Sequence, residues 1–132
     1  MLLVDTNVLV DVLQDDPDWA DWSAGQMRAL SSIHQLVINP VIYAEISLSF
    51  STLEALESVV ATLALEVREI PRPALFLAAK AYAQYRRRGG SRQQVLPDLF
   101  VGAHAAVEGW PLLTRDARRF RTYFPTLELV AP

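Results

Sequence analysis

Four acidic residues, far apart along the chain, are the strongest candidates for chemistry: Asp5, Glu45, Asp98 and Asp116. Asp5 directly follows the apolar run at residues 2–4, where an ionised carboxylate is costly unless it is paired or bound to a cation. Carboxylates brought close together repel one another, and a cation relieves that repulsion. Oxygen donors without thiolates select Mg²⁺ or Mn²⁺. The four acids therefore indicate a magnesium or manganese site, provided that the fold brings them together.

Each acid also has a simpler explanation when it is taken alone. Asp5 could cap a helix that begins near Thr6. Glu45 could be a solvated residue on a helix face, although its neighbours are nearly all apolar. Asp98 and Asp116 could be first-turn acids that the helix dipole favours. The set favours the metal site, because each acid lies just after a predicted strand or in a helix next to one.

The elements that must position these acids alternate between short apolar runs and segments of helical spacing. We expect five strands: Leu2 to Asp5, Leu36 to Ile38, Val67 to Ile70, Pro111 to Thr114 and Leu127 to Val130. Two helices fit between the first two strands, the second with Pro17 at its first position. The remaining helices are expected from Asn39-Pro40, from the capping box Ser51 to Glu54, and at Pro73 to Arg88, Pro97 to Glu108 and Asp116 to Phe124.

This alternation predicts an α/β fold with a mostly parallel sheet, since parallel neighbours need crossover connections. Such sheets bind ligands at the carboxyl ends of their strands. With 132 residues, 52% of them hydrophobic, and no glycine- or serine-rich linker, the chain is expected to form a single domain over residues 1–132.

Composition also limits the class of protein. Asp5 and Asp11 interrupt the amino-terminal apolar run, so we expect neither a membrane span nor a signal peptide. Cysteine is absent, which excludes disulfides, thiolate catalysis and cysteine-based zinc sites and agrees with a cytoplasmic location.

The charges are divided unevenly between the two halves of the chain. Residues 1–66 hold one basic and ten acidic residues, whereas residues 67–132 hold eleven basic and five acidic residues. The second half is therefore the better candidate for meeting a polyanion. The candidate RNA-binding residues are Arg86, Arg87, Arg88, Arg92 and Arg115. Alternatively, the first four could offset a helix dipole and Arg115 could belong to a solvated face.

Several of these residues stand in motifs that carry a family resemblance. The motifs are Leu3-Val4-Asp5-Thr6-Asn7, Glu45 within a helix, Pro97-Asp98, and Thr114-Arg115-Asp116 followed by Phe120. In this order the chain resembles the PIN-domain ribonucleases, and in particular the VapC-type toxins of type II toxin-antitoxin systems. The resemblance covers nearly the whole chain. It implies a PIN-like three-layer fold with sheet order 3-2-1-4-5, which periodicity alone does not provide.

The resemblance also implies an activity and partners. The four acids would hold Mg²⁺ or Mn²⁺ in an endoribonuclease that leaves a 5′-phosphate and a 3′-hydroxyl. Asn7 and Thr114 would orient the ligands or a water molecule, although turn or cap chemistry is an alternative for both. The expected partners are an RNA substrate, a cognate antitoxin and a second copy of the chain. An apolar surface for a partner is suggested by Leu13, Trp19, Trp22 and Met27, for which core packing is the alternative.

Other functional classes fit the sequence less well. A haloacid-dehalogenase phosphatase needs a second Asp where this chain has Asn7, and both that family and receiver domains need a lysine near the site. The only lysine, Lys80, lies within a predicted helix. We interpret His34 and His104 as structural. The alternative from another class is a non-catalytic RNA-binding or scaffold module that retains the acidic pocket.

Overall fold

A five-stranded sheet lies at the centre of the computed structural model, which describes residues 1–132. Its strands are β1 (Leu2–Val4), β2 (Leu36–Ile38), β3 (Glu66–Val67), β4 (Leu112–Leu113) and β5 (Leu129–Val130). The order is β3-β2-β1-β4-β5 and every pair is parallel. The α/β class and the order implied by the resemblance are confirmed, and the sheet is wholly parallel rather than mostly so.

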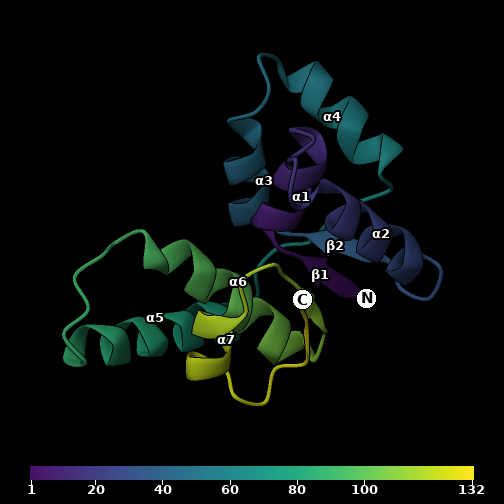
Figure 1. The fold of residues 1–132 in the computed structure, drawn as a ribbon. Coiled ribbons are helices and arrows are strands. Elements are labelled where there is room, and N and C mark those ends of the chain that lie inside the picture. Colours follow the sequence, from purple (N-terminus) through teal and green to yellow (C-terminus); the bar gives the residue numbers. More distant parts are fainter.

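Seven helices surround this sheet: α1 (Thr6–Leu13), α2 (Ala20–Ser31), α3 (Pro40–Ser47), α4 (Leu53–Thr62), α5 (Arg72–Arg87), α6 (Val95–Glu108) and α7 (Arg118–Tyr123). Figure 1 shows them in two groups, α1 to α4 and α5 to α7, with β1 and β2 between the groups. None of the helices combines the length and the apolar character that crossing a bilayer requires.

The outer strands are shorter than the sequence pattern predicts. The strand expected at Val67 to Ile70 is paired only over Glu66–Val67. The reason is its neighbour: β2 ends at Ile38, because the next residue, Asn39, turns away to cap α3. A longer β3 would have no partner for its backbone groups.

Several helix starts also differ from their predicted positions. The prediction for Pro17 is wrong, because Asp16 accepts from the backbone N–H groups of Asp18 and Trp19 and forms a turn, so that α2 begins only at Ala20. Thr52, rather than Ser51, caps α4 by accepting from the N–H of Ala55 at 3.2 Å. The helix expected from Pro97 begins at Val95, and the helix expected from Asp116 begins at Arg118.

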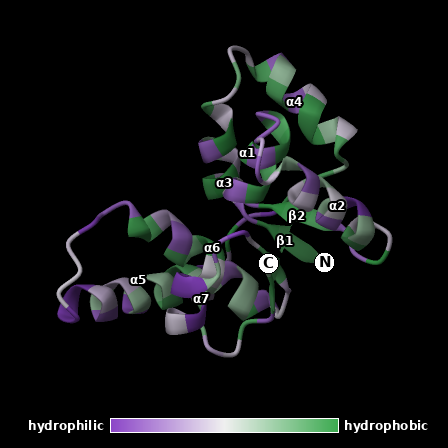
Figure 2. Cartoon of the chain, viewed as in Figure 1, coloured by the Kyte–Doolittle hydropathy of each residue, from purple (hydrophilic) through white to green (hydrophobic).

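The central strand supplies the most enclosed part of the core. Leu2, Leu3 and Val4 of β1 are completely buried, as are the residues of β4. Figure 2 shows hydrophobic residues along β1 and β2 and hydrophilic residues along the outer surfaces of the helices. Burying each such side chain stabilises the fold by about 1.5–3 kcal/mol, so that the strand ends are held firmly in place.

A buried hydrogen bond joins α3 to α6. Asn39 accepts from the N–H of Ile42 through its Oδ1 at 3.0 Å, and its Nδ2 lies 3.2 Å from Nδ1 of His104. Because the side-chain oxygen of Asn39 already caps α3, its amide nitrogen donates to the imidazole. Burial lowers the pKa of His104, which favours the neutral ring that can accept this bond. His104 therefore has a structural role in tying the two helices together.

Candidate active site

Asp5 lies at the carboxyl end of β1 and is only 4% exposed. Its Oδ1 accepts from the backbone N–H of Thr6 at 2.8 Å and caps α1, while its Oδ2 accepts from Oγ1 of Thr114 at 2.9 Å. Burial, followed by the negative charge of Asp98, raises the pKa of Asp5 to about 7, against the opposing effect of its two hydrogen bonds. The capping role and a position beside other acids therefore hold at once.

Glu45 reaches the same region through a hydroxyl group. It lies near the carboxyl end of α3, and its Oε1 accepts from Oγ1 of Thr6 at 2.7 Å. The charge of Glu45 is one of the influences that raise the pKa of Asp5. This contact holds α3 against the amino-terminal end of α1. Thr6 lies between two carboxylates, because its backbone N–H donates to Asp5 and its hydroxyl donates to Glu45.

Asp116 is held by the loop that follows β4. Oγ1 of Thr114 accepts from the N–H of Asp116 at 3.2 Å and from Nδ2 of Asn7 at 3.3 Å. The other end of the Asn7 amide accepts from the N–H of Arg115 at 3.1 Å. Asn7 and Thr114 thus connect the start of α1 to this loop, while Asp116 itself is exposed.

Asp98 comes from the first turn of α6 and forms an ion pair with Arg119 of α7. Burial raises the pKa of Asp98, the charge of Asp116 raises it further, and Arg119 opposes both effects. Because Asp98 acts on Asp5 and Asp116 acts on Asp98, the four predicted acids form one electrostatic group at the carboxyl end of the sheet. Their spacing is still wide, as no three His, Asp or Glu side chains lie close enough to hold a metal ion together.

One charged residue in this region was not singled out from the sequence. Asp11 on α1 is 1% exposed and accepts from Arg115 through both oxygens, at 2.8 and 3.0 Å, and from Oγ of Ser23 at 2.8 Å. The guanidinium of Arg115 also lies over the Trp19 ring, 5.4 Å from its centroid. An acid between Val8 and Val12, on the apolar side of a predicted helix, was the available signal.

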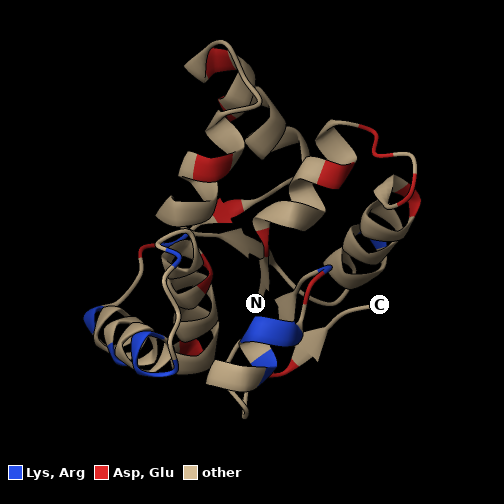
Figure 3. Ribbon diagram, turned by 60° about the vertical axis from the view of Figure 1, so that its left-hand side comes forward, with Lys and Arg blue, Asp and Glu red and all other residues tan.

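Arg115 is therefore anchored by Asp11, while its side chain stays 31% exposed. Since it stands between Thr114 and Asp116, its pair with Asp11 fixes the backbone of the loop that carries the fourth acid. Arg86, Arg87 and Arg88 are exposed at the carboxyl end of α5, and Arg92 is exposed in the following loop. Figure 3 shows the basic residues at that end of α5 and on α7, and most of the acids on the other side of the molecule.

The apolar residues expected to form a partner surface are placed differently from one another. Met27 is 6% exposed and belongs to the core. Trp19 and Trp22 are half-buried and pack edge to face with ring centroids 6.0 Å apart, and Leu13 is also half-buried. Met27 is therefore a core residue. Trp19 and Trp22 bury part of their surface against each other and remain partly exposed.

A parallel sheet in this order, with Asp5 and Asp116 following β1 and β4, is the α/β arrangement that the resemblance of the sequence motifs implies. The sequence model of one family, described as the PIN domain, matches residues 2–124. The chain belongs to the PIN-domain family. No curated protein matches the sequence.

Solved structures share the fold at low sequence identity. One is VapBC2 from Rickettsia felis bound to a DNA fragment from their promoter, with TM-score 0.75, 19% identity, and coverage of 99% of this chain and 98% of that chain. VapBC-1 from nontypeable Haemophilus influenzae gives TM-score 0.74 and 16% identity over 98% and 96% of the two chains. DNA-bound VapBC from Salmonella typhimurium gives TM-score 0.72 and 19% identity, with coverage of 98% of this chain and 96% of that chain.

Proposed function

We propose that this protein is a metal-dependent endoribonuclease, and that it acts as the toxin of a toxin-antitoxin pair. The observation that carries the nuclease proposal is the electrostatic group of four carboxylates at one end of the sheet: Asp5, Glu45, Asp98 and Asp116. Like charges that act on one another weaken the fold, so the capping role of Asp5 and the ion pair of Asp98 do not explain why four acids share this region. A functional ligand of positive charge accounts for it.

The donor set fits Mg²⁺ or Mn²⁺. All four side chains offer oxygen atoms, which are the ligands that these hard cations prefer. The wide spacing of the acids is compatible with this, because Mg²⁺ is usually held by one or two carboxylates, with water and substrate phosphate in its other positions. Asp5 is the leading ligand, since it is buried and fixed in orientation. Arg119 now balances the charge of Asp98, a part that a cation would take over.

When bound, the metal ion would supply Lewis acidity, acidify a water molecule and offset charge on the scissile phosphate. The protein's own residues prepare the site for it. Thr114 donates to Asp5 and Thr6 donates to Glu45, so that neither carboxylate can turn away. Asn7 holds Thr114 and the backbone of Arg115, which keeps Asp116 at the rim of the site. Hydrogen bonds of this outer kind typically change metal affinity or activity by about 10–100-fold.

RNA as substrate is supported by the family membership and by the basic second half of the chain, which offsets the repulsion between four acids and a polyanion. The toxin role is supported by the fold shared with VapBC complexes. It implies a cognate antitoxin, a second copy of the chain as a dimer mate, and a cytoplasmic target. Co-expression with the product of an adjacent small reading frame tests the antitoxin, because relief of growth arrest requires a specific complex.

The nuclease proposal is tested with purified protein and a panel of RNAs, in Mg²⁺, in Mn²⁺ and in EDTA. We expect cleavage with either ion, none in EDTA, and loss of at least about 100-fold for Asp5→Asn or Glu45→Gln. Glu54→Gln is the matched control, because Glu54 is exposed in the first turn of α4. Cleavage that survives EDTA or Asp5→Asn contradicts the proposal. Binding without cleavage of any RNA favours the scaffold alternative.

A further inference from the structure

Three tyrosines and several arginines gather where the end of α5 meets α7. Tyr82 and Tyr85 of α5 stack with centroids 6.2 Å apart, and Tyr123 of α7 meets Tyr85 edge to face at 6.4 Å. The guanidinium of Arg88 lies over the Tyr123 ring, 5.4 Å from its centroid, and Nη1 of Arg86 lies 3.4 Å from the hydroxyl of Tyr82. We call this set the tyrosine-arginine cluster: Tyr82, Tyr85, Arg86, Arg88 and Tyr123.

The loop after α5 is shaped around the middle ring of the cluster. The N–H of Arg92 donates to the Tyr85 hydroxyl at 3.2 Å. Gly90 lies so close to the same ring that an added Cβ would come within 2.4 Å of Tyr85 Cζ, and Gly89 has φ of 89°. The loop therefore needs glycine at both positions to wrap the ring. The arginines on each side are presented outward by a defined backbone.

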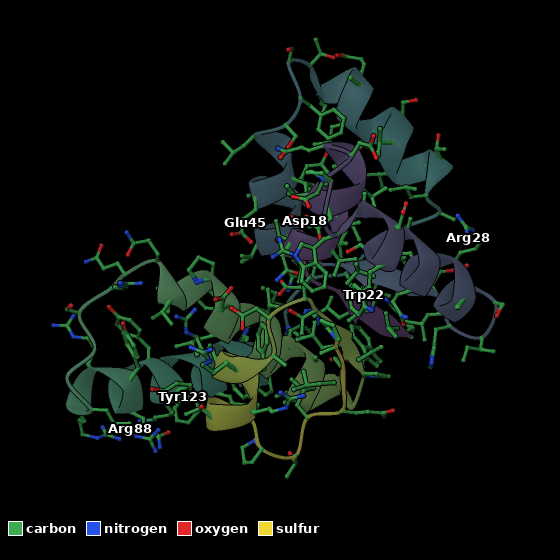
Figure 4. All side chains as sticks on the ribbon, viewed as in Figure 1. Asp18, Trp22, Arg28, Glu45, Arg88 and Tyr123 are labelled. Atoms are coloured by element: carbon green, nitrogen blue, oxygen red, sulfur yellow. The ribbon has the colours of Figure 1, made fainter.

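The cluster leads directly to the proposed active site. Arg119 of α7 pairs with Asp98, and Tyr123 lies four residues further along the same helix. Residues four apart share one helix face and are separated by about 6 Å along the axis. One face of α7 therefore carries a contact to an active-site carboxylate at its start and the cluster at its end. In Figure 4 the labelled side chains of Arg88 and Tyr123 lie together at the α5 side of α7.

This arrangement suits a ligand that has flat, uncharged rings linked by negatively charged groups. An arginine stacked on an aromatic ring presents its outer plane to a nucleobase, and its charge attracts the phosphates on either side. A helix-end role explains why arginines are present at the end of α5, but it does not explain why Arg88 lies over a tyrosine ring and Arg86 contacts a tyrosine hydroxyl. Proteins that bind single strands combine aromatic platforms and basic residues in this way.

We propose that the tyrosine-arginine cluster binds unpaired nucleobases of a single RNA strand that runs on to the four carboxylates. The proposal rests on the proposed function for the identity of the substrate and adds where its bases bind. The stretch of RNA on the cluster must be unpaired, because bases within a duplex cannot stack on these side chains. The cluster would then bind the RNA, and the carboxylates would cleave it.

Binding is measured apart from cleavage, by fluorescence anisotropy of a labelled RNA with the full chain as Asp5→Asn. The probes are a 12-nucleotide single strand, the same strand in a perfect duplex, and the same strand with abasic sites. We expect the single strand to bind most tightly. Arg88→Ala and Tyr123→Leu should each weaken it by roughly 5–100-fold, the range that base–aromatic stacking covers. Tyr123→Phe, which keeps the ring, should bind like the parent protein.

The abasic strand gives the sharper comparison. If Tyr123 and Arg88 stack on bases, their replacement adds no further loss once the bases are absent. Arg72→Ala is the matched control. Arg72 is exposed at the opposite end of α5, and its replacement by alanine removes the same charge as Arg88→Ala. It should change the affinity less than twofold. Thermal unfolding of each variant checks that the fold is retained.

Three outcomes overturn the proposal. Variants at Arg88 and Tyr123 that bind the single strand within twofold of the parent show that the cluster is no binding site. If Arg72→Ala weakens binding as much as Arg88→Ala does, the RNA is attracted by charge alone. The same conclusion follows if the variants at Arg88 and Tyr123 lose as much affinity for the abasic strand as for the intact strand. If the variants at Arg88 and Tyr123 bind RNA like the parent but no longer bind an acidic partner protein, the cluster is a protein-binding surface. A wild-type chain that cleaves nothing but shows the expected binding would contradict only the proposed function.

Discussion

The burial of Asp5 predicts that this side chain weakens the metal-free protein as the pH rises. Its pKa is about 7 in the folded protein, against 3.8 as the ordinary value. A carboxyl whose pKa is raised by folding stabilises the folded state fully below its ordinary pKa, and this contribution is lost as the pH rises through the folded value. The window for Asp5 therefore runs from about pH 4 to about pH 7.

The magnitude follows from the same two values. Each tenfold change in proton affinity is worth about 1.4 kcal/mol, so that the full effect for Asp5 is about 4 kcal/mol. The perturbation is Asp5→Asn, which keeps the shape of the side chain and removes its charge. The free energy of unfolding of the variant, relative to the wild type, should rise by up to about 4 kcal/mol between pH 4 and pH 8. Any fixed loss from altered hydrogen bonds to Thr6 and Thr114 does not depend on pH.

The assay is urea unfolding in EDTA at a series of pH values, followed by tryptophan fluorescence. Asp21→Asn is the matched control, because Asp21 is exposed in the first turn of α2 and its replacement removes a carboxylate in the same way. Mg²⁺ should stabilise the wild type at pH 8 and leave Asp5→Asn nearly unchanged. A difference between Asp5→Asn and wild type that stays flat from pH 4 to pH 8 would refute the reasoning.

Two further predictions concern packing and the internal ion pair. Gly102→Ala should lower the free energy of unfolding by about 1–3 kcal/mol, because the added Cβ would meet the Phe124 ring; Gly25→Ala, where nothing lies within 4 Å, should be neutral or slightly stabilising in thermal melts. Asp11→Asn and Arg115→Ala should each destabilise the protein by about 1–3 kcal/mol, and the double variant by less than their sum. Additive losses in this double-mutant cycle would show that the pair contributes no mutual stabilisation.

The parallel sheet and the position of Asp5 at the end of β1 could be predicted because both follow from local patterns, whereas the sheet order was implied by the family resemblance. Short apolar runs alternating with helical spacing predict a parallel sheet, and acids beside such runs predict where its ligand site lies. Strand lengths could not be predicted, since β3 ends where its neighbour β2 stops offering partners. That limit depends on Asn39, which turns the chain away at the end of β2 to cap a helix.

The partners of the charged residues were the other part that the sequence could not provide. Asp11 and Arg115 are 104 positions apart, and their pair exists only because β1 and β4 are neighbours in the sheet. Arg119 on Asp98 depends in the same way on α7 packing against α6. The tyrosines of α5 also appear unremarkable in the sequence, because stacking with a ring on another helix leaves no periodic signal.

The bond between Asn39 and His104 has a consequence for how this protein can change. Glu45 and Asp98 belong to the two helices that meet at that bond, so the gap between their carboxylates is set at a junction that touches neither of them. Replacing the imidazole with a bulkier or shorter group would shift both helices and retune the gap. In the proposed metal site, the distance between two of the ligands would therefore change from deep inside the protein, with all four acids left in place.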